Sequence, residues 1–257
     1  MLTLKNISKS YQDNLEPTIK GIDLHLNEGE FCAIIGSNGS GKSTLLKLVS
    51  GEELPDKGTI ALCEQNVTSL NAFARSKYIS IVTQDIDKGL VPEMTLLENM
   101  VLCLKESAKF GFYFSRAPSE KIITFIQSIE LGFEKYLHKP LRTLSGGQRQ
   151  VIATMMSLLS HPKLLLLDEH TSALDPIVRR KLMDYTVSQT KKNNMTTLMI
   201  THDLEDAIQY SDRIIMLTQG KISKNVSIRN KTSIDKTLFL KNFYQPNSLV
   251  DEESIYA

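Results

Sequence analysis

The stretch Gly36-Ser37-Asn38-Gly39-Ser40-Gly41-Lys42-Ser43 fits the phosphate-loop pattern GxxxxGK[ST] at every fixed position. A short apolar run, residues 31–35, comes before it, and the apolar spacing from Thr44 onward is that of a helix. Strand, glycine-rich loop and helix in this order are the context that the pattern requires. We therefore predict an α/β fold with a phosphate-binding loop, rather than a glycine-rich turn that carries a solvated lysine.

The residues of this loop suit a nucleoside triphosphate. Glycine lets successive backbone N–H groups turn inward around a phosphate, and the helix N-terminus adds the positive end of its dipole. Lys42 is expected to reach the β- and γ-phosphates, while the Ser43 hydroxyl binds Mg²⁺ and Thr44 supports the α-phosphate side. The expected nucleotide-binding residues are Gly36, Ser37, Asn38, Gly39, Ser40, Gly41, Lys42, Ser43 and Thr44.

Two other apolar runs, residues 163–167 and 197–200, end abruptly in polar residues. They are typical of buried parallel strands, and ligands of open α/β sheets bind beyond the carboxyl ends of such strands. Asp168 can hold Mg²⁺ through a bound water, and Glu169 can direct its carboxylate at an attacking water. Without the phosphate loop, two solvated acids at a strand end would be the simpler interpretation. The predicted fold is a P-loop NTPase (RecA-like) core with a mainly parallel sheet.

The rest of the chain adds to this core. Short stretches in which apolar and polar residues alternate, in residues 2–26 and again in residues 59–83, predict a small N-terminal antiparallel β subdomain. Helical spacing in residues 94–141, beginning with an apolar stripe at Leu97, Val101 and Leu104, predicts an inserted α-helical subdomain. One more helix is expected near residues 234–243. A group of aromatic residues is either part of the helical core or an exposed contact for a partner: Phe110, Phe112, Tyr113 and Phe114.

Composition excludes several classes of protein. Of the 257 residues, 30 are Lys or Arg and 29 are Asp or Glu, so the formal net charge is +1 and no nucleic-acid partner is expected. The 3 cysteines are widely spaced without a CxxC pair, which favours a reduced, cytosolic compartment. The N-terminus lacks a secretory signal pattern, and no apolar run approaches the ~18 residues of a membrane span. Any membrane role is therefore expected to come through a partner.

Residues 144–150, Leu-Ser-Gly-Gly-Gln-Arg-Gln, narrow the fold to one family. Ser145 and Gln148 have the spacing of a capping box, and an apolar stripe that a helix would bury follows them. A cap does not require the two glycines between them, whereas bare backbone at a helix N-terminus suits close approach to an anion. The stretch matches the LSGGQ signature of the ATP-binding subunit of ABC transporters, and the chain resembles that family over about residues 1–224.

The resemblance implies roles for individual residues. Glu169 would act on the attacking water, with Lys42 and His202 at the γ-phosphate, while Gln84 would touch Mg²⁺ and pass the nucleotide state to the helical subdomain. The implied metal contacts are Ser43, Gln84 and Asp168. The further implied nucleotide contacts are Tyr11, which stacks on adenine, and Ser145, Gly146, Gly147, Gln148 and Asp175. His170 stands where many members of the family have proline, which would fix the backbone after Glu169 more firmly.

The resemblance also implies domains, cofactors and partners. An ABC ATPase domain over residues 1–224 would contain the helical subdomain at about residues 85–143, and residues 225–257 would form a C-terminal extension. ATP and Mg²⁺ are the implied cofactors. Two cassettes would pair head to tail, as a homodimer or with a second ABC ATPase subunit. A membrane permease and a solute-binding protein are the other implied partners, with the subunit in the cytoplasm on the inner face of the membrane.

Two functions share these motifs. The first is energy supply to a membrane transporter, and residues 89–100 and 168–175 are similar to a branch associated with import of amino-acid-like solutes. The second is a soluble ABC ATPase for assembly or remodelling, such as iron–sulfur cluster assembly. The hinge position of Gln84 and the residues around His170 favour transport.

Overall fold

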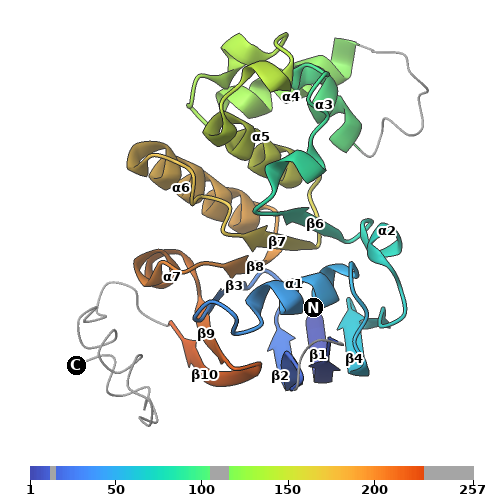
Figure 1. Ribbon diagram of the computed structural model, residues 1–257. Helices are drawn as coiled ribbons and strands as arrows, with labels where there is room; N and C mark the ends of the chain where they lie inside the picture. The colour runs from blue at the N-terminus through green and yellow to red at the C-terminus, as the bar shows by residue number, and fades with distance from the viewer. Residues whose placement is uncertain (12–15, 105–115, 229–257) are drawn as a thin grey trace. The chain divides into compact units, whose positions relative to one another are not determined.

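The structure, a computed structural model, describes residues 1–11, 16–104 and 116–228. Of these residues, unit 1 contains 1–11, 16–79 and 196–228, and unit 2 contains 80–104 and 116–195. Figure 1 shows the helices and strands of both units. The aromatic group at residues 110–114 and the helix expected at residues 234–243 lie outside the described residues.

Unit 1 contains an antiparallel sheet with the strand order β2-β1-β4-β5. Figure 1 labels β2, β1 and β4 of this sheet. Its strands are β1 (Leu2–Lys9), β2 (Ile19–Leu26), β4 (Lys57–Leu62) and β5 (Gln65–Asn66). Leu2 pairs with Leu26 on one side and Leu62 on the other, and all three side chains are buried. Because alternate residues of a strand face the same side, these leucines share one buried face. The predicted N-terminal antiparallel subdomain is confirmed.

The prediction for residues 59–83 is wrong in its second half. The chain forms the short helix α2 (Ala72–Arg75), whose cap is Asn71: its side chain accepts a hydrogen bond from the Ala74 backbone N–H at 3.0 Å. The next strand, β6 (Ile79–Val82), pairs with β7 (Leu164–Asp168) and not with the antiparallel sheet. An alternating pattern indicates which faces of a strand are buried, but not which strand is its neighbour.

The phosphate loop of unit 1 is attached to a mainly parallel group of strands. β3 (Phe31–Ile35) pairs in parallel with β8 (Thr196–Ile200) and with β9 (Arg213–Thr218), while β10 (Lys221–Ser227) pairs with β9 in the antiparallel direction. Every residue of β3 and β8 is buried, as expected for parallel strands covered on both faces. In the described part of this unit, the helices are α1 (Lys42–Ser50), α2 and α7 (Leu204–Tyr210).

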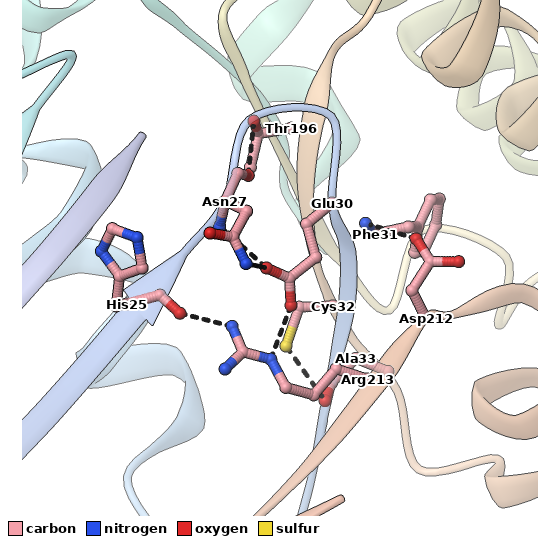
Figure 2. Close-up of polar contacts among 9 residues, drawn as sticks. All are labelled: His25, Asn27, Glu30, Phe31, Cys32, Ala33, Thr196, Asp212 and Arg213. Atoms are coloured by element: carbon pink, nitrogen blue, oxygen red, sulfur yellow. Dashed lines mark hydrogen bonds and ion pairs between the residues drawn. The ribbon is translucent and has the colours of Figure 1, made fainter. Parts of the chain in front are cut away.

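A polar cluster ties together the starts of β3 and β9 (Figure 2). Arg213 Nε lies 2.6 Å from Glu30 Oε1, and another guanidinium nitrogen of Arg213 donates to the carbonyl oxygen of His25. Asp212 accepts a hydrogen bond from the Phe31 backbone N–H at 3.0 Å through its carboxylate and donates its own N–H to the Phe31 carbonyl at 2.7 Å. These contacts fix the register of β3, and therefore the position at which its carboxyl end enters the phosphate loop.

Unit 2 is mostly helical. Its longer elements are α3 (Leu96–Cys103), α4 (Arg116–Gln127), α5 (Gly146–Leu159) and α6 (Pro176–Lys192), together with β6, β7 and the short 3-10 helices η1 (Ile86–Gly89), η3 (Phe133–Tyr136) and η4 (Leu141–Thr143). One apolar core joins α3, α4 and α5. The predicted helical segment is confirmed, but in α3 Leu96 and Met100 are fully buried while Leu97 and Val101 are only partly buried.

Asn99 is a buried polar anchor within this helical core. Its carboxamide oxygen accepts the Val91 N–H at 2.8 Å, and its amide nitrogen donates to the carbonyl oxygens of Val91 at 3.0 Å, Met94 at 3.3 Å and Thr95 at 3.0 Å. Because buried polar groups need partners, this full set of contacts fixes the loop that leads into α3.

Candidate active site

The phosphate loop runs from the end of β3 to the start of α1 and encloses its lysine. Lys42 Nζ donates to the carbonyl oxygens of Gly36 at 2.7 Å and Ser37 at 3.0 Å, and the Lys42 side chain is buried. The ammonium group is thereby held on the inside of the loop.

Two glycines of the loop are required by its shape. A Cβ atom at Gly36 would lie 2.3 Å from the carbonyl oxygen of Leu217, a backbone atom that cannot rotate away. Gly41 has φ +104°, which is rare for residues with a side chain, and a Cβ there would lie 2.8 Å from Ile19. The loop can therefore form only with glycine at both positions.

No side chain caps the start of α1. The N-cap residue is Gly41, which has no side chain that could accept hydrogen bonds from the N–H groups of the first turn. The neighbouring Ser40 hydroxyl is buried and has no hydrogen-bond partner. Backbone donors, a buried cation and the positive end of a helix together fit a phosphate group.

His202 lies at the same edge of the strands as the phosphate loop. β3 and β8 are parallel and in register up to Ile34 and Ile200, and the Thr201 N–H donates to the Ile34 carbonyl at 3.2 Å. The loop follows β3 and His202 follows β8, so both leave the carboxyl ends of adjacent strands. The His202 side chain is exposed.

Tyr11 follows β1 and contacts the residues around α1. Its hydroxyl donates to the carboxylate of Glu53, which comes shortly after the end of α1. Burial, followed by the hydrogen bond to Glu53, raises the pKa of Tyr11. Glu53 could not be identified from the sequence, because it lies 42 positions from Tyr11 and no local pattern connects the two residues.

In unit 2, the acidic pair follows β7. Asp168 is the last residue of the strand, and Glu169 has φ +47°, a left-handed conformation that is uncommon for residues other than glycine. Such conformations tend to occur at functional sites. His170 comes next, is 1% exposed and has no hydrogen-bond partner at Nε2; burial and, to a smaller extent, the charge of Arg179 lower its pKa to about 3.

The predicted capping box at the start of α5 is confirmed. The Ser145 hydroxyl accepts the Gln148 N–H at 3.2 Å, and the Gln148 side-chain oxygen accepts the Ser145 N–H at 3.0 Å. The side-chain nitrogen of Gln148 donates to Tyr136, so its contacts in this structure are structural. A Cβ at Gly146 would meet nothing, whereas one at Gly147 would lie 3.3 Å from Leu174.

The remaining residues singled out in unit 2 lie at element ends. Asp175 is the N-cap residue of α6, where its carboxylate accepts the N–H groups of Ile177 and Val178, both at 3.1 Å. Gln84 lies just after β6 and is exposed. The structure therefore groups Tyr11, the phosphate loop and His202 within unit 1, and groups Gln84, the signature, Asp168, Glu169 and Asp175 within unit 2.

No group of three or more His, Cys, Asp or Glu side chains that could hold a metal ion occurs among the described residues. Mg²⁺ does not require such a group, because it is usually held by one or two protein oxygens, waters and the phosphates of the substrate. The Ser43 hydroxyl of unit 1 and the Asp168 carboxylate of unit 2 are each an oxygen donor that fits this ion.

Residues 19–172 match the family described as ABC transporter. The chain belongs to the ABC transporter family. As a member of this family it is an ATPase that binds ATP, and its fold is the ABC cassette fold. No helix in residues 1–11, 16–104 and 116–228 has the length and apolar character needed to cross a membrane.

Relatives of this ABC subunit have transport names. The chain is 38% identical over 247 residues to a tyrosine transport ATP-binding protein of Clostridioides difficile, covering 95% of this chain and 98% of the relative. It is 35% identical over 247 residues to the spermidine/putrescine import ATP-binding protein PotA of Pasteurella multocida, of which it spans only 62%.

A solved structure of a dimeric ABC cassette in a post-hydrolysis state, bound to ADP and Pi, has a TM-score of 0.78 and 29% sequence identity to this chain. The similarity covers 90% of this chain and 100% of the cassette.

Proposed function

We propose that this ABC subunit hydrolyses ATP to power the import of an amino-acid-like solute through a partner permease. The observation that carries the proposal is the phosphate loop, whose buried Lys42 and uncapped helix start fit a phosphate. The tyrosine transport relative, matched over nearly its whole length, supports an amino-acid-like solute, and the transport names of both relatives favour transport over assembly.

The residues of unit 1 would bind the nucleotide. The N–H groups of the loop and the Lys42 ammonium hold the β- and γ-phosphates, Ser43 and Thr44 contact the phosphates or their metal ion, and Tyr11 stacks on adenine. His202, at the same edge, contacts the γ-phosphate. These groups offset the charge that develops on the transferred phosphoryl group, which is how such sites accelerate phosphoryl transfer.

The residues of unit 2 would complete the reaction. Glu169 orients and polarises the attacking water, while Asp168 and Gln84 contact Mg²⁺. The ion that these residues would hold would supply positive charge to stabilise the negative charge of the phosphates.

Pairing of two cassettes would complete each site. Ser145, Gly146 and Gly147 of one copy face the nucleotide of a second copy in a head-to-tail dimer, and Asp175 lies in the segment that crosses the interface. The dimeric form of the solved cassette supports this arrangement. In this proposal residues 1–224 form the ATPase domain, and the subunit works on the cytoplasmic face of the membrane.

A capture experiment tests the proposal. Tagged Glu169→Gln protein with ATP is recovered from detergent-solubilised membranes of its native host, and its partners are identified by mass spectrometry. We expect a multi-span permease in near-equal amount, and loss of that permease from the control Lys42→Ala/Glu169→Gln, which cannot hold ATP. Recovery of soluble partners alone would contradict the transport function.

The solute class has its own measurement. ATP hydrolysis by the purified complex with its solute-binding protein should increase with tyrosine or another amino acid and not with spermidine. Stimulation by spermidine alone would overturn the amino-acid assignment while leaving the ATPase function in place.

A further inference from the structure

We propose that Glu53 is a positioning residue for the nucleotide base, because it holds the ring of Tyr11 in one orientation. The inference rests on the proposed role of Tyr11 as the ring that stacks on adenine. The experiment below separates the failure of that role from the failure of the inference.

The Glu53 carboxylate links Tyr11 to the phosphate-loop helix. One oxygen, Oε2, accepts the Tyr11 hydroxyl, and the other, Oε1, lies 3.5 Å from Lys47 Nζ of α1. The Glu53 N–H also donates to the Lys47 carbonyl at 3.2 Å. Both the backbone and the side chain of Glu53 are thus fixed to the helix that begins at the phosphate loop. The distance between the ring and the phosphate donors is thereby set through a short, rigid connection.

Asp56, in the same turn, holds the residues just before Tyr11. Its Oδ2 accepts the Ser10 N–H at 2.7 Å, its Oδ1 lies 3.1 Å from Lys9 Nζ, and its own N–H donates to the Ser8 carbonyl at 2.9 Å. The Ser10 hydrogen bond, more than the Lys9 contact, lowers the pKa of Asp56, which keeps this carboxylate charged. These contacts hold the backbone before Tyr11 independently of any contact of its ring.

One face of the ring is already covered. Lys9 Nζ lies 5.9 Å from the centroid of the Tyr11 ring, within the range of a cation–π contact. We therefore expect the base to stack on the opposite face. With the backbone held by Asp56, one face covered by Lys9 and the hydroxyl held by Glu53, the ring is ordered before nucleotide binds. Such order lowers the entropic cost of binding.

Paired titrations test the inference. Affinities of the full chain for Mg²⁺-AMP-PNP, which carries the base, and for Mg²⁺-tripolyphosphate, which does not, are measured by calorimetry. Glu53→Ala and Tyr11→Phe should each weaken AMP-PNP binding by about 3- to 10-fold, the range expected when one side chain must be ordered on binding. Neither should change tripolyphosphate binding. The double variant should lose no more than Tyr11→Phe alone, because Tyr11→Phe removes the hydrogen bond to Glu53 as well as the one with Thr44.

Two controls complete the test. Glu53→Gln keeps an acceptor for the Tyr11 hydroxyl and should restore most of the affinity, whereas Glu52→Ala, an exposed glutamate in the same turn, should bind both probes as wild type does. If Tyr11→Ala weakens AMP-PNP binding while Glu53→Ala and Tyr11→Phe do not, Glu53 does not position the ring. Equal losses for both probes in Glu53→Ala would show a structural role only. If Tyr11→Ala also leaves AMP-PNP binding unchanged, the stacking role itself is wrong.

Discussion

Replacement of Arg75 by Met tests how the phosphate-loop helix is held at its far end. Arg75 is fully buried, and its guanidinium donates to the carbonyl oxygens of Leu48 at 2.7 Å, Val49 at 2.9 Å and Thr68 at 3.2 Å. Two of these acceptors belong to the last turn of α1, whose carbonyls have no partner within the helix. Burial lowers the pKa of Arg75, but an arginine remains charged at neutral pH.

The cost of this substitution follows from the three hydrogen bonds. A hydrogen bond to a charged group contributes ~1.5–3 kcal/mol, and a buried carbonyl left without a partner costs ~1–3 kcal/mol. Removal of the guanidinium also removes its desolvation penalty, which is several kcal/mol, so the three contributions do not add in full. We expect the free energy of unfolding to fall by about 2–4 kcal/mol, which lowers Tm by about 5–15 °C in a domain of this size.

Thermal unfolding of the full chain, followed by circular dichroism without nucleotide, measures the effect. Arg180→Met is the matched control, because Arg180 is exposed on α6, and its Tm should change by less than about 2 °C. Arg75→Lys should fall between the two, since a single ammonium cannot reproduce the fork of the guanidinium. An Arg75→Met protein that melts within about 2 °C of wild type would refute the reasoning.

Three further predictions follow from single residues. Gly36→Ala places a Cβ 2.3 Å from the Leu217 carbonyl, so nucleotide affinity should fall at least ~10-fold in an AMP-PNP titration; wild-type affinity would contradict the loop geometry. Asn99→Ala removes all its hydrogen bonds to the loop before α3 and should cost about 2–4 kcal/mol in urea unfolding, and a loss below ~1 kcal/mol would count against it. His170 has a pKa of about 3 in the folded protein, so below pH ~6.5 its imidazole becomes protonated in the unfolded chain while it stays neutral in the folded chain. The free energy of unfolding should therefore fall between about pH 6.5 and 3, by about 2 kcal/mol at pH 5. His170→Gln should remove this loss. If the variant has the same pH profile as wild type, His170 is not the source of the loss.

Local patterns predicted local structure well. The apolar runs became β3, β7 and β8, because a strand buried on both faces needs an uninterrupted apolar sequence. The capping box of Ser145 and Gln148 is confirmed, since it requires only residues three positions apart. The phosphate loop could be recognised because its motif is short, although the close approach that requires glycine at position 36 comes from Leu217, a residue far away in the sequence.

Pairing over long distances could not be predicted. β6 pairs with β7 although its alternating pattern was equally compatible with the antiparallel sheet. In α3 the predicted helical period was correct, but Leu96 and Met100 are the most deeply buried residues, in place of Leu97 and Val101. The packing partners of a helix decide which part of its apolar stripe is buried most deeply, and the sequence does not show them.

The sequence by itself determined the family, the parallel core and the phosphate loop. Each of these can be recognised from a short motif or a continuous apolar segment that lies within a few residues of the chain. The tertiary structure alone decided two contacts. Glu53 accepts the hydroxyl of Tyr11, 42 positions away, and Arg75 caps the carbonyls at the end of α1, up to 27 positions away. Such contacts have no periodic signature, because they form only when folding brings distant segments together and leaves a buried polar group in need of a partner.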